Sequence, residues 1–244
     1  NDGGDFISFE ETTTSVYVQS NAGSDSLVAA MSMTQSTVWS GADADSLSFQ
    51  AGGSQLAVEA QKGADTLDLG SQVVSFSQTT IRGGDGGNRF YDNAANNLNS
   101  TSIFGGSGND SLDFGSALRQ TSSIILGGEG TDSLTFAAVT GGSIFGGSSF
   151  QDTSDGADTL NLTGAVTTAK IDAAAGTNFV TAGGAITGGS VYGGGDKDTF
   201  ALNTAIASGS TNSRIHVAAG NDSLTFAGNV TSSVINLGSG ADSL

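Results

Sequence analysis

The sequence repeats one short pattern along nearly its whole length: a glycine-rich turn closed by Asp or Asn and followed by an apolar–polar alternation. Examples are GGSGNDSLDF from residue 105, GGEGTDSLTF from 127 and AAGNDSLTF from 218. The closing residue, called the anchor below, occurs twelve times at intervals of 20 to 26 residues. A fixed period of this length is typical of solenoids, in which each repeat forms one coil. The anchors are Asp5, Asp25, Asp45, Asp65, Asn88, Asp110, Asp132, Asp158, Asn178, Asp198, Asp222 and Asp242.

The residues around each anchor alternate with period two. Two residues after the anchor all twelve side chains are apolar, and four residues after it ten of eleven are, the exception being Asp92. Seven residues before most anchors stands Val or Ile; before Asp158, Ile144 takes that role if residues 148–154 form an inserted loop. This period predicts strands with one buried face. Frequent Gly and β-branched residues and the lack of a 3.6-residue stripe argue against helices.

Each coil is therefore predicted to hold a strand, the glycine-rich turn, a second strand and a looser polar turn. We expect an all-β fold, a right-handed parallel β-solenoid (β-roll or β-helix) of about twelve coils of 20–26 residues. Residues 1–244 should form a single continuous domain, a window of a longer chain, because both ends fall within repeats. A weaker apolar position, expected to face inward, follows each anchor by eight residues at Met33, Val73, Leu118, Val166, Ile186, Ile206 and Val230.

Composition narrows the classes of partner. Seven Lys and Arg stand against 24 Asp and Glu, a formal net charge of −17, which argues against nucleic acid or an anionic membrane surface. There is no Cys for a disulfide framework and no apolar run of 18 residues, so membrane insertion is not expected.

The turns concentrate the acidic charge. Sixteen of the 24 acidic residues lie in the six-residue segments that end at the anchors. In a parallel solenoid equivalent carboxylates stack about 4.8 Å apart and repel one another, so a counter-ion is expected between coils. Carboxylate and backbone carbonyl oxygens suit Ca²⁺. The alternative is that Asp and Asn merely favour tight turns.

Two of the turns carry a known signature. GGSGND (105–110) before SLDF and GGEGTD (127–132) before SLTF resemble the nonapeptide of the RTX (repeats-in-toxin) family. The resemblance implies calcium-loaded β-rolls in secreted bacterial proteins. Carried over to the matching positions, it makes Asp110 and Asp132 ligands through their side chains. It gives the glycines of the two turns, Gly105, Gly106, Gly108, Gly127, Gly128 and Gly130, the role of shaping the loop. The other copies are degenerate, and their Asp anchors are expected to be metal ligands because the carboxylates stack in one column. Because one motif occurs per coil, where the RTX roll has two, only one calcium-lined edge is expected, and Asn88 and Asn178 should mark weak or empty sites.

Catalytic signals are weak. His216 is the single histidine, expected on an outward position, and there is no Cys with which it could pair. Tyr17, Trp39 and Tyr192 should also face outward, where a neighbouring molecule or a glycan could contact them. We therefore expect no enzymatic activity in this segment.

The main hypothesis is a non-enzymatic structural protein of a bacterial cell surface: a surface-layer, sheath or filament subunit, or an adhesin stalk. Its partners would be calcium ions, further copies of itself in a lattice or filament, and cell-surface glycan. One alternative is a passive β-roll segment of a secreted enzyme or toxin. Another is a polysaccharide-active β-helix, which should show a groove lined by acids and aromatics.

Overall fold

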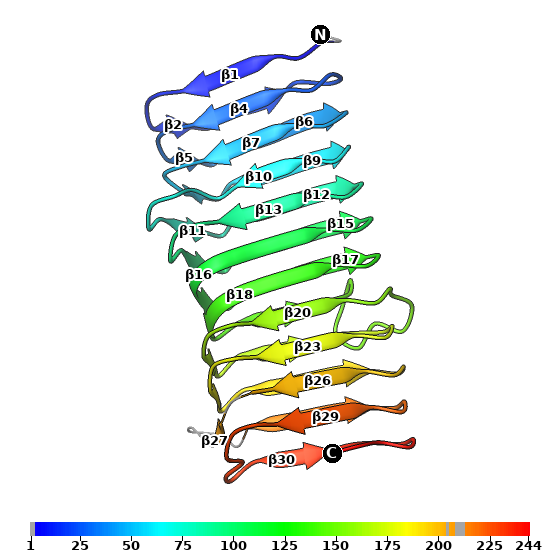
Figure 1. Cartoon of the computed structure of the whole chain (residues 1–244). Helices are drawn as coiled ribbons and strands as arrows, with labels where there is room; N and C mark the ends of the chain where they lie inside the picture. Colours follow the sequence, from blue (N-terminus) through cyan, green and yellow to red (C-terminus); the bar gives the residue numbers. More distant parts are fainter. Residues whose placement is uncertain (1–2, 204, 208–212) are drawn as a thin grey trace.

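The computed structural model is a rod of stacked coils with the two termini at opposite ends (Figure 1). It describes residues 3–203, 205–207 and 213–244. Strands pair in parallel with the equivalent strands of the coils before and after. The described part of the chain holds no helix, and so none that could cross a membrane. The predicted all-β, right-handed parallel β-solenoid is confirmed.

Each coil has three strand positions, not the two that the sequence predicts; in the last coil the second is only an isolated bridge at Val230. The first follows the anchor, a short second one lies within the polar turn, and the third precedes the next glycine-rich turn. First and second strands form a 19-stranded sheet, here sheet B, and third strands an 11-stranded sheet, here sheet A. The twelve anchors thus bound eleven coils.

The first strands are β1 (Phe6–Phe9), β4 (Ser26–Ala29), β7 (Ser46–Phe49), β10 (Thr66–Asp68), β13 (Arg89–Asp92), β16 (Ser111–Thr121), β18 (Ser133–Thr140), β20 (Thr159–Leu162), β23 (Phe179–Ala182), β26 (Thr199–Leu202) and β29 (Ser223–Phe226). The strands β16 and β18 continue into the second position. The other second strands are β2 (Thr13–Thr14), β5 (Met33–Thr34), β8 (Gly53–Ser54), β11 (Ser75–Ser77), β14 (Asn97–Asn99), β21 (Val166–Thr167), β24 (Ile186–Thr187) and β27 (Ile206–Ala207). The third strands are β3 (Tyr17–Gln19), β6 (Thr37–Ala42), β9 (Ala57–Lys62), β12 (Thr80–Asp85), β15 (Ser102–Ser107), β17 (Ile124–Glu129), β19 (Ser143–Phe145), β22 (Lys170–Asp172), β25 (Ser190–Gly194), β28 (Arg214–Ala218) and β30 (Val234–Asn236).

The core consists of ladders of the predicted apolar positions. Leu47 pairs in register with Leu67 in sheet B, and Val58 pairs with Ile81 in sheet A. All four are buried. One coil cannot cover its own apolar residues, but the coils above and below do so, which makes the stack the unit of stability.

A sharp corner separates the second and third strands. One residue there, ten before the anchor, has a positive φ of about 50° and an exposed side chain. The left-handed conformation costs roughly 1–2 kcal/mol for a residue other than Gly. Ser, Gln and Thr have no preference for it, so the sequence does not predict this corner. Their recurrence shows that the corner is part of the repeat. They are Ser15, Gln35, Gln55, Gln78, Ser100, Ser122, Thr168 and Ser232.

Two residues expected to face inward do not. Val73 is 67% exposed, because its coil is longer and Phe76 takes the inward place opposite Gly53. Val230 is 40% exposed and lies in the last coil, where no further coil covers it. The prediction was wrong at both positions.

The insertion lies where the sequence predicts it. Ile144 pairs with Ile125 and Ile171 in sheet A, so residues 148–154 stand outside the regular coil. Figure 1 shows them in the long loop that precedes β20.

Candidate metal site in the glycine-rich turns

The anchors form one column on the inner side of the glycine-rich turns. The ten anchors from Asp25 to Asp222 are at most 4% exposed, whereas Asp5 and Asp242 at the two ends are partly exposed. Burying a carboxylate is costly unless donors or a cation satisfy it. The hydrogen bonds of each oxygen therefore decide what the column can bind.

One oxygen of every anchor is used by the fold. The backbone N–H of each anchor donates to the Oδ1 atom of the anchor in the next coil, at 2.6–3.0 Å. Eleven such bonds join all twelve anchors. The ladder accepts Asp and Asn equally, since both present an Oδ1 acceptor.

The other oxygen of most Asp anchors has no donor. Oδ2 is buried and without a hydrogen bond in Asp25, Asp45, Asp65, Asp110, Asp132, Asp158 and Asp222. In Asp198, by contrast, Oδ2 accepts the N–H of Gly194 at 2.8 Å. Seven unsatisfied buried oxygens in one column are far more than accident would leave, because each costs on the order of 1–3 kcal/mol or more.

The two Asn anchors show what surrounds that second oxygen. Nδ2 of Asn88 donates to the carbonyls of Gly86 and Gly105 at 3.1 and 3.3 Å. Nδ2 of Asn178 donates to the carbonyls of Ala174 and Ala175, both at 3.1 Å. By equivalence of the coils, an Asp anchor places an acceptor oxygen where these carbonyls converge. Carbonyl oxygens then face a carboxylate oxygen, and a proton, a cation or another donor must lie between them to satisfy both.

The glycines leave space for this arrangement. A Cβ on Gly105 would lie 2.4 Å from Oδ2 of Asp110, and one on Gly127 would lie 2.5 Å from Oδ2 of Asp132. The first Gly of the turn is therefore required by the anchor itself.

The four glycines predicted to shape the metal loop have positive φ. The angles are +127° at Gly106, +117° at Gly108, +123° at Gly128 and +131° at Gly130. A Cβ on Gly106 would lie 2.0 Å from the carbonyl oxygen of Gly84 in the preceding coil. These glycines are needed for the turn and for close stacking, whether or not an ion is bound.

Burial holds protons on the anchors when no cation is near. Desolvation raises the pKa of Asp65, Asp110 and Asp198 to about 6 each, and repulsion by Asp110 adds to desolvation in raising the pKa of Asp132 to about 7. Around neutral pH a proton and a divalent cation would compete for the same oxygens.

The insertion adds a second carboxylate at one anchor. Oδ2 of Asp155 is buried and unpartnered, as is Oδ2 of Asp158, while Oδ1 of Asp155 accepts the N–H groups of Gly130 and Gly156. Burial, then repulsion by Asp155 and Asp132, raises the pKa of Asp158 to about 9. At this anchor the two neighbouring carboxyls share a proton at neutral pH unless a cation takes its place. Sequence reasoning missed Asp155, because the regular register places its position outward.

The donor set suits a hard cation. Each Asp turn offers one free carboxylate oxygen and several backbone carbonyls, which is Ca²⁺-type chemistry. Within the described ranges, no three His, Cys, Asp or Glu side chains converge on one point. An ion would therefore be held mainly by backbone oxygens and water around a single carboxylate, or around two at Asp158.

Two further polar residues belong to other parts of the fold. Asp92 is buried, but its Oδ1 accepts the N–H of Ala94 and Nδ2 of Asn96, so it is a satisfied core residue. His216 lies on the outer face of sheet A, 6.1 Å from the ring of Tyr192.

Comparison with known proteins places the fold. No protein-family model matches the sequence, and a search of curated proteins gives no match. The RTX resemblance thus rests on the motifs alone. Among solved structures, the chain is similar to a hyperactive, Ca²⁺-dependent, β-helical antifreeze protein from an Antarctic bacterium. The match covers 98% of this chain and 82% of that one, with a TM-score of 0.69 and 17% identity. At that identity the likeness concerns the β-helical fold.

Proposed function

We propose that this chain is a non-enzymatic, calcium-binding structural solenoid, secreted and located at a bacterial cell surface. One observation carries the calcium proposal: seven of the ten Asp anchors bury an oxygen without a donor at the place where the Asn anchors put an amide that donates to backbone carbonyls. A cation satisfies both the carboxylate and the carbonyls.

Calcium would lie at the Asp anchors along one edge of the rod, with backbone oxygens of the turn completing its shell. In the two motif-perfect turns these come from the segments containing Gly106 and Gly108, and Gly128 and Gly130. Asn88 and Asn178 would hold none, because their amides already occupy the carbonyls. The Ca²⁺ dependence named for the structurally similar antifreeze protein supports this proposal.

The surface role follows from shape and charge. Bound calcium would offset a net charge of −17 and stiffen a thin rod that contains no disulfide. Such a rod suits a surface-layer, sheath or filament subunit, or an adhesin stalk. The alternative, a passive segment of a secreted enzyme or toxin, predicts a catalytic domain elsewhere in the same gene product, which the sequence of the complete gene would reveal.

Far-UV circular dichroism during a calcium titration of EGTA-treated protein tests the proposal. We expect a cooperative gain of β signal with calcium and little with magnesium, which demands a tighter octahedral shell than these backbone turns provide. A complete β spectrum in EGTA, unchanged by calcium, would contradict it.

A second candidate function is ice binding. Outward side chains of the second strands form a run of hydroxyl and amide groups in register, at Thr14, Thr34, Ser54, Ser77, Asn99 and Thr121. A regular polar row on a flat sheet, together with the antifreeze activity of the similar structure, favours this candidate. Thermal hysteresis measured in calcium tests it, and its absence at millimolar protein would exclude it.

A further inference from the structure

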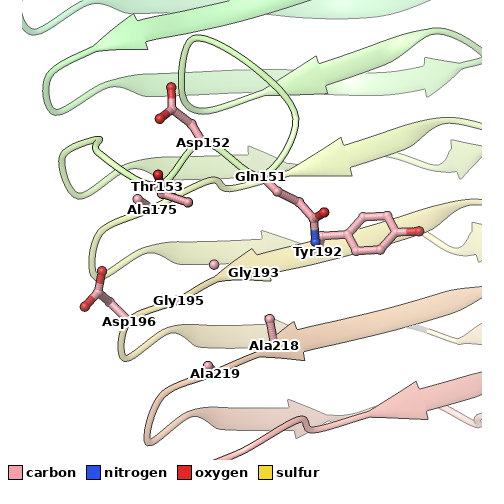
Figure 2. Close-up of a pocket in the computed structure, with 11 residues that line it drawn as sticks. Gln151, Asp152, Thr153, Ala175, Tyr192, Gly193, Gly195, Asp196, Ala218 and Ala219 are labelled. Atoms are coloured by element: carbon pink, nitrogen blue, oxygen red, sulfur yellow. The ribbon is translucent and has the colours of Figure 1, made fainter.

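The insertion walls a cavity of about 420 Å³ on the outer side of the glycine-rich turn that precedes the Asp198 anchor. Figure 2 shows the insertion on one side and the end of β25 with its following turn on the other. Among the coils that the structure describes in full, only this one carries an insertion of this kind, and the cavity belongs to this part of the rod.

The wall is fixed to sheet A. Phe150 packs edge-on against Tyr192 with ring centres 5.3 Å apart, and the ammonium of Lys170 lies over the Phe150 ring. The N–H of Gln151 donates to Oδ2 of the buried Asp172 at 2.8 Å. The cavity is thus largely formed before any ligand arrives, as small-molecule sites usually are.

The floor of the cavity contains a glycine, Gly195, that the fold does not require. At Gly194 a Cβ would lie 1.7 Å from the carbonyl oxygen of Ala174, so stacking demands Gly there. At Gly195 a Cβ would meet nothing within 4 Å, and its φ is not left-handed. Neither packing nor backbone geometry explains Gly195. Its effect is to keep the cavity floor free of side chains.

Free polar groups surround this floor. The side-chain amide of Gln151 and Oδ1 of Asp196 make no hydrogen bond to another described residue. Oδ2 of Asp196 accepts the N–H of Gly176 at 3.2 Å, which fixes the carboxylate. The hydroxyl of Tyr192 points away from Gly195 and Asp196 (Figure 2), so the ring of Tyr192, one donor–acceptor amide and one free carboxylate oxygen remain for a ligand.

The charge and the aromatic ring narrow the ligand class. The described lining contains two carboxylates, Asp152 and Asp196, and no Lys, Arg or His, which disfavours phosphates, sulfates and sugar acids. Asp152 already accepts hydrogen bonds from Ser148 and Ser154. The set that remains, an aromatic ring beside several hydroxyl-matching groups over a flat floor, suits a hydroxyl-rich ring without negative charge.

A second hollow continues the site. A cavity of about 260 Å³ lies on the other side of Tyr192 and is lined by Arg214, His216 and Asn236. Tyr192 borders both cavities, so a ligand longer than one ring can pass from one to the other along sheet A.

We propose that these cavities bind a neutral oligosaccharide, with a sugar ring against Tyr192 and its hydroxyls bonded to Gln151 and Asp196. The site lies on the outer side of the turn whose inner side holds Asp198, an anchor whose Oδ2 already accepts the N–H of Gly194, and it goes beyond the structural role. In a cell-surface rod it would attach one part of the rod to a glycan.

Saturation-transfer NMR on the full chain in excess calcium tests this with four probes: cellobiose, maltose, lactose and N,N′-diacetylchitobiose. At least one should bind, and Tyr192→Ala and Gly195→Leu should each weaken it at least tenfold. Gly195→Leu fills the floor without disturbing the coil. Tyr17→Ala, an exposed Tyr on the same sheet, and Gly3→Leu, another Gly with nothing within 4 Å of its Cβ, are matched controls that should bind normally.

Three results would overturn the proposal: no transfer to any of the four probes at 10 mM, equal binding by Gly195→Leu and wild type, or binding of glucuronate or ethanolamine alone. Melting curves in calcium show whether each variant is folded. All samples contain calcium. If the wild-type protein folds with calcium but binds none of the saccharides, the saccharide site is refuted and the calcium proposal is not.

Discussion

The turn closed by Asp110 and the turn closed by Asn88 differ by one functional group and solve opposite problems. Both receive a backbone N–H on Oδ1. Asn88 then satisfies two carbonyls with its own amide, whereas Asp110 turns a bare oxygen toward the equivalent space. The Asn turn is complete by itself, and the Asp turn is complete only with a cation or a proton. The rod therefore alternates between stretches that need an ion and coils that do not.

Removing calcium should have the largest effect. Each site held at 100 times its dissociation constant contributes about 2.7 kcal/mol, and several sites together exceed the usual stability of a domain. We expect EGTA to lower the melting temperature by tens of degrees or to abolish the cooperative transition, measured by calorimetry. An unchanged melting curve would show that the Asp turns need calcium no more than the Asn turns do.

Changing Asn88→Asp should make the complete turn incomplete. In EGTA the variant loses two hydrogen bonds and gains a buried charge, so its stability should fall by about 2–4 kcal/mol. In calcium it should recover and bind one additional ion, measured by calorimetric titration. Asn93→Asp adds the same charge at an exposed position and should do neither. Equal behaviour of the two variants would count against the account.

The converse change, Asp110→Asn, should free one coil from calcium. The amide can donate to the turn carbonyls while Oδ1 keeps the ladder bond, so stability in EGTA should rise by about 1–2 kcal/mol and one ion should be lost. Asp113→Asn, on the exposed side of the same coil, is the control. A less stable variant in EGTA would mean that the carboxylate needs no counter-ion.

The two-carboxylate position should bind its ion most tightly. Asp155→Ala leaves Asp158 with a single free oxygen, and we expect the highest-affinity step of the calcium titration to weaken about tenfold. The steps at other anchors should be unchanged, except at the neighbouring Asp132 turn, whose Gly130 N–H also binds Asp155. Loss of affinity at every step would point to a global folding defect instead.

The smallest effect is that of pH on the calcium-free rod. The anchor pKa values are raised in the fold, to about 6 at Asp65 and about 9 at Asp158, above the unfolded value near 3.8. Folding therefore favours the protonated carboxyls. Their contribution to the free energy of unfolding is fully present below about pH 4 and is lost as the pH rises through the folded pKa values, from about 6 to about 9. Melting in EGTA should occur at higher temperature at pH 5 than at pH 8. In calcium the order should reverse, because protons compete with the ion.

Much of the fold could be predicted from the sequence, because inward positions repeat with the coil. Leu47 and Val58 lie where period two places them. The corner at Gln35 could not be predicted, since Gln carries no preference for a positive φ. Val73 was misplaced because apolar character alone cannot show which of two nearby residues, here Phe76, turns inward.

For the candidate site, the sequence predicted the column of stacked anchors but not the hydrogen bonds that join them. Repulsion between stacked carboxylates predicted a counter-ion, yet the Oδ1 ladder, which any Asp or Asn can form, left no sequence signal. Asp155 was missed because its position, three residues before the anchor, faces outward in a regular coil, as Glu129 does before Asp132. The cavity proposed to bind saccharide is lined by Gly195 and Gln151. The sequence does not show that these two residues lie together, because they meet only when the insertion packs against sheet A.

The most direct measurement is anomalous diffraction from crystals grown in calcium chloride, collected at a wavelength where calcium scatters anomalously. The account predicts a peak beside Oδ2 of Asp110, Asp132 and Asp158, and none beside Nδ2 of Asn88 or Asn178. Peaks at the Asn turns as strong as those at the Asp turns, or no peaks in the column at all, would contradict it.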